Sequence, residues 1–292
     1  TRSNKMDLQF TPKCHARHTG GWMIDADWLN AEIASIKSGL IVPMAIDEAT
    51  ASAPFIIGED GIMTIALQGP LMKAASKFGG TSTIAVRRAL RAAVNDPDIQ
   101  GIMLAIDSPG GAVAGMEDLA EDVVAAAEVM PVHAFIDSQG ASAAYWVASQ
   151  AHTISAQKSA LVGSLGTLLV VEDTSKAADM AGVKVHVLST GPFKGMGVPG
   201  SEVTDDHLAE MFRNVLGLNG MFMEAVSAGR GLDMEHVLAA ADGSVHMGHE
   251  ALAAGLIDKV QNFDKARAEL VDEVGKRRTV RAQTRVREAR LR

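Results

Sequence analysis

Cysteine is nearly absent from this 292-residue sequence, in which Cys14 is the only one. An intrachain disulfide is therefore excluded, and with it a small scaffold held together by disulfides. Cys14 lies near His15 and His18, a combination found in metal sites. Fewer than four ligands at zinc spacing argue against such a site, so we expect no bound metal.

Long hydrophobic runs are also missing. A stretch such as Leu161–Val171 is short and interrupted by glycines, whereas a membrane-spanning helix needs about 20 apolar residues. We therefore expect a soluble chain without a membrane span. No basic segment followed by an apolar one opens the sequence, so no cleavable signal is visible.

Positive charge is in the minority, with 27 Lys and Arg against 35 Asp and Glu and a formal net charge of -8. This balance gives no reason to expect nucleic acid as the partner of the folded core, whereas a peptide is compatible with it. The length, with 47% apolar residues, is enough for one sizeable core plus extensions.

Short apolar runs and amphipathic helices alternate along the centre of the chain. Runs bounded by glycine, proline and asparagine predict strands, and segments with helical periodicity predict helices. This alternation predicts an α/β fold with mostly parallel strands buried on both faces. The predicted strands are 62–67, 99–106, 132–136, 153–156 and 184–188, and the predicted helices include 27–37, 83–94, 114–129, 141–149, 175–181, 204–229 and 234–240.

The composition changes at both ends of this alternating region. Residues 1–60 read as an N-terminal extension, 61–262 as the catalytic domain and 263–292 as a charged helical tail. Residues 276–292 contain eight Lys or Arg against one Glu. We expect this basic tail to be a solvated helix or to contact an acidic partner.

Three turns contain residues that suit nucleophilic catalysis. Asp107–Gly111 follows a predicted strand and precedes a helix, where glycine N–H groups can bind an oxyanion. Ser142 stands among small residues at a helix start, which suits a nucleophile but is also typical of a helix cap. Lys194, flanked by Phe193 and Gly195, can act as a base only where burial favours its neutral form; alone it reads as a solvated lysine.

Four motifs in this order resemble the signal peptide peptidase A family of serine proteases. They are Asp-Ser-Pro-Gly-Gly at 107–111, Ala-Ser-Ala-Ala-Tyr-Trp at 141–146, Gly-Ser-Leu-Gly at 163–166 and Gly-Pro-Phe-Lys at 191–194. The resemblance covers about Gly61 to Val260. It implies a Clp-protease and crotonase-like fold of repeated ββα units, a Ser-Lys dyad and no cofactor.

The resemblance also implies a role for each matching residue. Ser142 would be the nucleophile, Lys194 the general base and Ser164 the residue that orients the lysine amine. The N–H groups of Gly111 and Ala143 would form the oxyanion hole. An extended peptide would bind by strand addition along the substrate-binding residues Gly110, Ala112, Val113, Gly163 and Leu165.

Several details are more similar to the phage prohead, or capsid-maturation, branch of this family. Ala143 and Ala144 follow the predicted nucleophile where many cellular members have two glycines, and Leu165 replaces a branched residue. The resemblance implies a homo-oligomer in the host cytoplasm or viral procapsid that cleaves scaffold and head proteins.

Three alternatives remain open from the sequence. The chain could be a cellular signal-peptide or protein-quality-control peptidase of the same family, a crotonase-like acyl-CoA enzyme, or an inactive assembly module. Two histidines near the motifs are interpreted as structural. His152 falls at a helix-to-strand junction, and His133 lies inside a strand, where the backbone would satisfy it.

Overall fold

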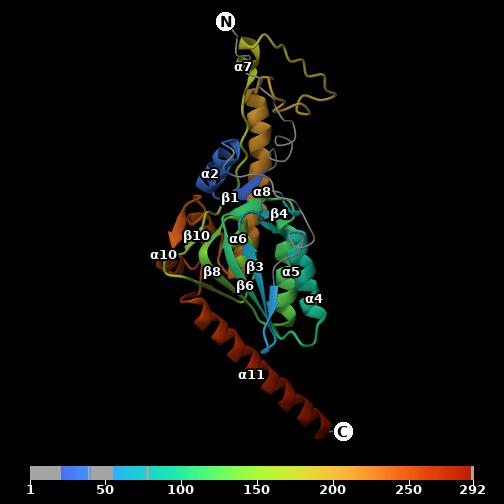
Figure 1. Cartoon of the computed structure of the whole chain (residues 1–292), viewed down its shortest axis with the longest axis vertical. Coiled ribbons are helices and arrows are strands. Elements are labelled where there is room, and N and C mark those ends of the chain that lie inside the picture. Colours follow the sequence, from blue (N-terminus) through green and yellow to red (C-terminus); the bar gives the residue numbers. More distant parts are fainter. Residues whose placement is uncertain (1–20, 39, 41–54, 77–78, 291–292) are drawn as a thin grey trace. The chain divides into compact units, whose positions relative to one another are not determined.

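The computed structural model describes residues 21–38, 40, 55–76 and 79–290 (Figure 1). The chain forms two compact units. The larger contains Trp22–Leu168 and Leu216–Arg292, and the smaller contains Leu169–Val215. Cys14, His15 and His18 lie outside the described residues.

The larger unit is built on an eight-stranded sheet in which parallel neighbours predominate. Its centre runs β3, β6, β8 and β10, all parallel, with β9 also parallel to β8 and β12 parallel to β9. β2 and β11 pair antiparallel at the two ends. The predicted α/β fold with mostly parallel strands is confirmed. The strands are β2 Phe55–Ile57, β3 Ile62–Gln68, β6 Gly101–Ser108, β8 Val132–Ala141, β9 Thr153–Ala156, β10 Leu161–Gly163, β11 Val245–Met247 and β12 Lys259–Val260.

A second, smaller sheet has the order β1-β7-β4-β5. These strands are β1 Trp22–Ile24, β7 Gly110–Ala112, β4 Leu71–Met72 and β5 Thr81–Ser82. β1 comes from the predicted N-terminal extension, and the helix after it, α2 (Ala26–Lys37), matches the predicted helix there. Asp25 caps this helix by accepting a hydrogen bond from the Trp28 backbone N–H at 2.8 Å.

Helices cover both faces of the large sheet. α4 (Thr83–Asn95) and α5 (Met116–Val129) lie side by side along it (Figure 1). Alternate residues of β6 face opposite ways: Leu104 belongs to the main core, whereas Met103 packs with α11 (Phe263–Arg290) on the other face. This alternation explains why the strand reads as a continuous apolar run. The remaining helices are α6 Ala143–Ala148, α7 Ser175–Met180, α8 Asp205–Arg230, α9 Met234–Ala239 and α10 Gly248–Ala253.

The first part of α11 belongs to the core. Ala266, Leu270 and Val274 recur at helical spacing and are buried against Ile62, Met103 and Phe135. The basic segment that starts at Lys276 follows this buried stripe. A truncation that removes the basic segment but spares the core must therefore fall after Gly275, because removing everything after Asn262 would uncover a core face.

The smaller unit differs from the sequence prediction at 184–188, which has no strand in the structure. The segment finds no neighbouring strand, and Val187 and Leu188 are exposed. None of residues 169–215 is buried. No helix among the described residues is long and apolar enough to cross a membrane.

His133 on β8 links the core to α11, and its partner is a side chain rather than the backbone expected from the sequence. Its Nε2 lies 2.9 Å from Glu273 Oε2, and the residue is 5% exposed. Burial lowers the pKa of His133 below its ordinary value of 6.5, although Glu273 opposes the shift. Between the two pKa values, His133 therefore binds a proton in the unfolded chain but stays neutral in the folded chain.

We expect the free energy of unfolding to fall as the pH drops from about 6.5 toward the lowered pKa of His133. The loss should be smaller in His133→Gln, which cannot titrate in this range. Urea unfolding at pH 7.5 and 5.5 measures both. The same decrease in wild type and variant would show that His133 does not contribute to acid sensitivity.

Candidate active site

Ser142 stands at a sharp turn between the end of β8 and the start of α6. Its backbone has φ 52° and ψ -121°, and Ser164 (φ 49°) is the one other non-glycine residue of the described part with positive φ. Such angles are strained for a residue with a Cβ and concentrate at functional sites. A serine at a strained turn between a strand and a helix is also found at the nucleophile elbow of α/β-hydrolases.

The Ser142 side chain is buried but nearly unpartnered. The residue is 1% exposed, and its Oγ donates one long hydrogen bond, at 3.4 Å, to the Gly166 carbonyl. Its backbone is held tightly, because Ser142 N–H donates to the Gly163 carbonyl at 2.7 Å. The backbone of Ser142 is thus held in place, while its hydroxyl makes only this one long hydrogen bond.

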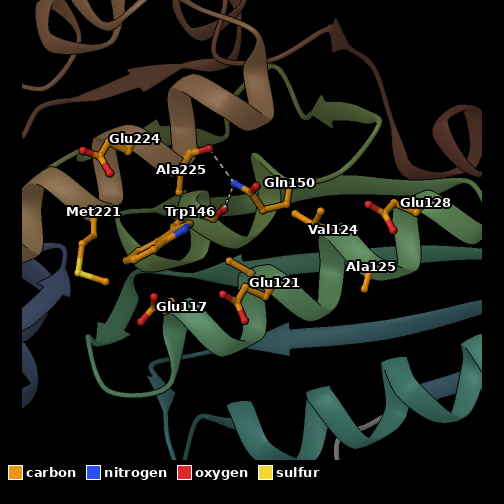
Figure 2. Close-up of a pocket in the computed structure, with 11 residues that line it drawn as sticks. Glu117, Glu121, Val124, Ala125, Glu128, Trp146, Gln150, Met221, Glu224 and Ala225 are labelled. Atoms are coloured by element: carbon orange, nitrogen blue, oxygen red, sulfur yellow. Dashed lines mark hydrogen bonds between the residues drawn. The ribbon is translucent and has the colours of Figure 1, made fainter.

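Helix α6 holds this turn rigidly, since all six of its residues are buried. Trp146 stacks on Phe222 of α8 with ring centroids 5.2 Å apart, and Gln150 donates to the carbonyls of Trp146 and Ala225 (Figure 2). Tyr145 donates to the Leu256 carbonyl at 2.7 Å, and burial raises the pKa of its phenol, so this donor stays protonated. Contacts of Tyr145, Trp146 and Gln150 thus anchor the helix that follows Ser142.

A groove of about 430 Å³ lies beside Trp146, and Figure 2 shows the residues that line it. Glu117, Glu121 and Glu128 of α5 line one side, and Glu224 of α8 lies on the other. None of the residues predicted for catalysis or substrate binding lines it. The candidate site around Ser142 is therefore separate from this groove.

Ser164 lies next to Ser142 because of strand register. β10 is the parallel neighbour of β8, and Gly163 pairs with Ala141. The two serines thus leave adjacent strands at the same level. Ser164 is 7% exposed, and its N–H donates to the Ser244 carbonyl.

The two predicted oxyanion donors come from β7 and α6. Ala143 opens α6, where the first N–H groups have no partner within the helix. A Cβ built on Gly110 would lie 3.0 Å from Ala143 N, so β7 passes directly beside the start of α6. Gly111 allows no side chain, since its Cβ would lie 1.9 Å from the Leu71 carbonyl oxygen.

Gly111→Ala is therefore expected to lower the free energy of unfolding by about 2–3 kcal/mol, because β7 must shift away from β4. Peptide hydrolysis should fall with it. Gly166→Ala is the matched control, since a Cβ there meets nothing within 4 Å. Urea unfolding and turnover of both variants test this; equal stability of the two would show that the β4–β7 approach is not constrained.

Lys194 belongs to the smaller unit, so the geometry around Ser142 does not include it. It is exposed in a turn where its backbone N–H donates to Gly191 at 3.3 Å. Within the larger unit the structure brings together Ser142, Ser164, Gly111 and Ala143.

The predicted substrate-binding strands have no free edge in this structure. β7, with Gly110 and Ala112, lies between β1 and β4, and β10, which ends at Gly163, lies between β8 and β11. Val113 directly follows β7, and Leu165 follows Ser164 and is fully buried. A peptide could add to β7 only by displacing a strand, because both of its edges already have partners.

Three features of the site were not predicted. The Gly166 carbonyl accepts the Ser142 hydroxyl, and Gly166 was noted only as the last residue of its motif. His246 on β11 lies beside Gly163, with a buried Nε2 that has no hydrogen-bond partner. The third feature is strand β1, since no motif or apolar run in the sequence predicted a strand at Trp22–Ile24. No group of three metal-ligating side chains occurs among the described residues.

Residues 125–280 match the sequence profile described as Peptidase family S49. The matched span covers more than half of the chain and contains Ser142, Ser164 and Lys194. The chain belongs to peptidase family S49. The predicted resemblance to signal peptide peptidase A proteases is thereby confirmed, and the predicted enzyme class, a peptidase, is the class of this family.

Relatives occur among both phage and cellular proteins. The chain is 30% identical to capsid assembly protease C of Escherichia phage lambda over 75% of its own length and 51% of that protein. It is 27% identical to head-tail preconnector protein GP5 of Enterobacteria phage P21 (64% and 37%) and 24% identical to a putative signal peptide peptidase SppA of Enterococcus faecium (56% and 48%). The chain thus spans about half, or less, of the length of these relatives.

Among solved structures, an enoyl-CoA hydratase/isomerase family protein from Silicibacter pomeroyi is similar at a TM-score of 0.46 and 15% identity. The alignment covers 77% of this chain and 81% of that one.

Proposed function

We propose that the chain is a serine endopeptidase in which Ser142 is the nucleophile and Lys194 the general base. The observation that carries this is the strained, well-anchored turn at Ser142, with Ser164 beside it and strand β7, which contains Gly111, next to the start of α6 at Ala143. Ser142 Oγ attacks the scissile carbonyl, Lys194 takes its proton, and the two N–H groups stabilise the oxyanion. Ser164 orients the lysine amine.

An active-site label tests this assignment directly. A peptidyl phosphonate should react with one serine, and mass spectrometry of the digest should locate the adduct on Ser142. Ser149, buried at the other end of α6, is the internal control. A label found on another residue, or none at all, would refute the nucleophile assignment.

A homo-oligomer is part of the proposal. Leu208, Phe212 and Leu216 form an exposed apolar row at helical spacing on α8, with Phe212 61% exposed. None of residues 169–215 is buried, so the apolar side chains of this unit can be buried only by contact with another surface.

Phe212→Asp is therefore expected to dissociate the oligomer and to lower peptide turnover with it. Sedimentation velocity and hydrolysis at the same protein concentration measure the two effects. Asp206→Asn on the same helix is the control for a changed charge. Full turnover by a monomeric Phe212→Asp protein would contradict the proposed dependence on assembly.

We further propose that the substrates are phage scaffold and head proteins and that the site of action is the procapsid. Two relatives support this, since their names are a capsid assembly protease and a head-tail preconnector protein. Family membership favours a peptidase over a crotonase-like acyl-CoA enzyme. The backbone strain at Ser142 favours an active enzyme over an inactive assembly module, because such strain concentrates at functional sites.

A further inference from the structure

Strand β1 lies where the peptide substrate of Ser142 is expected to bind. On one side it pairs antiparallel with β7, with Met23 opposite Gly111 and Ile24 opposite Gly110. On the other side Trp22 exchanges two 2.8 Å backbone hydrogen bonds with Leu168. β1 therefore bridges the segment that holds the oxyanion donor and the segment that follows Ser164.

The carbonyl of Met23 is directed at the proposed oxyanion hole. Asp25 N–H donates to the Pro109 carbonyl at 2.8 Å. Hydrogen-bonded pairs alternate along an antiparallel ladder, so Met23 and Gly111 form the next such pair and Gly111 N–H points at the Met23 carbonyl. A Cβ built on Gly110 would lie 2.2 Å from the Met23 oxygen and 3.0 Å from Ala143 N, so this oxygen is also close to the second donor.

The side chains of β1 fill two apolar sites on opposite faces of the strand. Met23 is fully buried in the main core cluster. Trp22 and Ile24 are 5% and 3% exposed and pack with Leu29 of α2. Helix α2 thus packs on the face of β1 that carries Trp22 and Ile24, and it helps to hold the strand against β7.

We propose that β1 is an internal pseudosubstrate: it occupies the peptide groove of Ser142 as an extended substrate strand would, and it must leave before a peptide can bind. This inference rests on the proposed function. It assigns a substrate class, an extended peptide segment with an unbranched apolar side chain at the position of Met23 and bulky apolar residues on either side. Competition from β1 raises the apparent KM for such a peptide, because only the fraction of molecules with an open groove can bind it.

A disulfide that locks β1 onto β7 tests the inference. Trp22 and Ala112 form a non-hydrogen-bonded pair, whose Cα separation of about 4.5 Å suits a disulfide. The test protein is full-length Cys14→Ser with Trp22→Cys and Ala112→Cys. Ile57→Cys with Met63→Cys, a non-hydrogen-bonded cross-strand pair on β2 and β3, is the matched control. The probe is a fluorescent peptide that copies residues 21–27.

Probe binding is measured in a Ser142→Ala background, so this readout does not depend on hydrolysis. Oxidised test protein should bind the peptide at least about tenfold more weakly than the same protein after reduction, whereas the control pair should show no change. Met23→Asp should bind the probe peptide more tightly than wild type, because a buried carboxylate destabilises β1 in its apolar site. In the catalytically intact background, the lock should suppress hydrolysis and reduction should restore it.

The two backgrounds separate this inference from the proposed function. Redox-dependent binding without hydrolysis in any form would uphold the pseudosubstrate and refute the peptidase assignment. Hydrolysis and binding that are equal in the locked and reduced forms would refute the pseudosubstrate and leave the peptidase assignment in place.

Discussion

Ser142→Ala is expected to lower peptide hydrolysis by on the order of 10³-fold or more while leaving the fold intact, since loss of a nucleophile removes the covalent route altogether. The fold should survive because Ser142 Oγ makes only one long hydrogen bond. Alanine also has a Cβ, so the backbone strain at φ 52° is unchanged. Turnover of a labelled scaffold peptide and circular dichroism measure the two properties.

Ser149→Ala provides the matched comparison for this variant. Ser149 is buried at the other end of α6 and donates to the Trp146 carbonyl at 2.7 Å. Its loss should cost about 1 kcal/mol of stability and leave the rate of hydrolysis nearly unchanged. Residual hydrolysis at the wild-type rate in Ser142→Ala would mean that another residue is the nucleophile.

Lys194→Arg is expected to abolish hydrolysis as completely as Lys194→Ala. Arginine keeps the positive charge but stays protonated, so it cannot accept the proton of Ser142. Because nucleophile and base act as a unit, the double variant Ser142→Ala/Lys194→Ala should be no slower than either single one. Ser164→Ala should have a smaller effect, of about tenfold, since it only orients the base.

Two controls make the Lys194 result specific. Lys184→Arg changes another lysine of the smaller unit and should keep wild-type turnover. His246→Phe removes the unpartnered imidazole near Gly163 and should also remain active. Loss of activity in His246→Phe together with an active Lys194→Arg would assign the base to His246 instead.

Local patterns predicted much of this protein correctly. The apolar runs at 62–67 and 99–106 became the parallel strands β3 and β6, and the helix at 83–94 became α4. These elements are predictable because the period of apolar residues reflects which faces are buried. The serine motif at 141–146 likewise lies where β8 ends and α6 begins, since its small residues allow the sharp turn found there.

Other predictions depended on partners far away in the sequence. Residues 184–188 have strand-like composition but meet no neighbouring strand, and a strand exists only as part of a sheet. His133 pairs with Glu273, which is 140 positions away. The apolar stripe at the start of α11 is short and lies among charged residues, so the sequence predicted a solvated tail. The structure shows that this stripe packs on Phe135 and Ile62.

The sequence by itself determined the α/β fold, because apolar periodicity is encoded locally, and the resemblance of its four ordered motifs identified the family and the candidate nucleophile. Only the tertiary structure decided that Ser142 and Ser164 lie side by side, through the register of β8 and β10, and that both edges of β7 are occupied. Backbone hydrogen bonds form between any two strands that meet, so residue identity alone does not say that Trp22–Ile24 will be the strand beside Gly111.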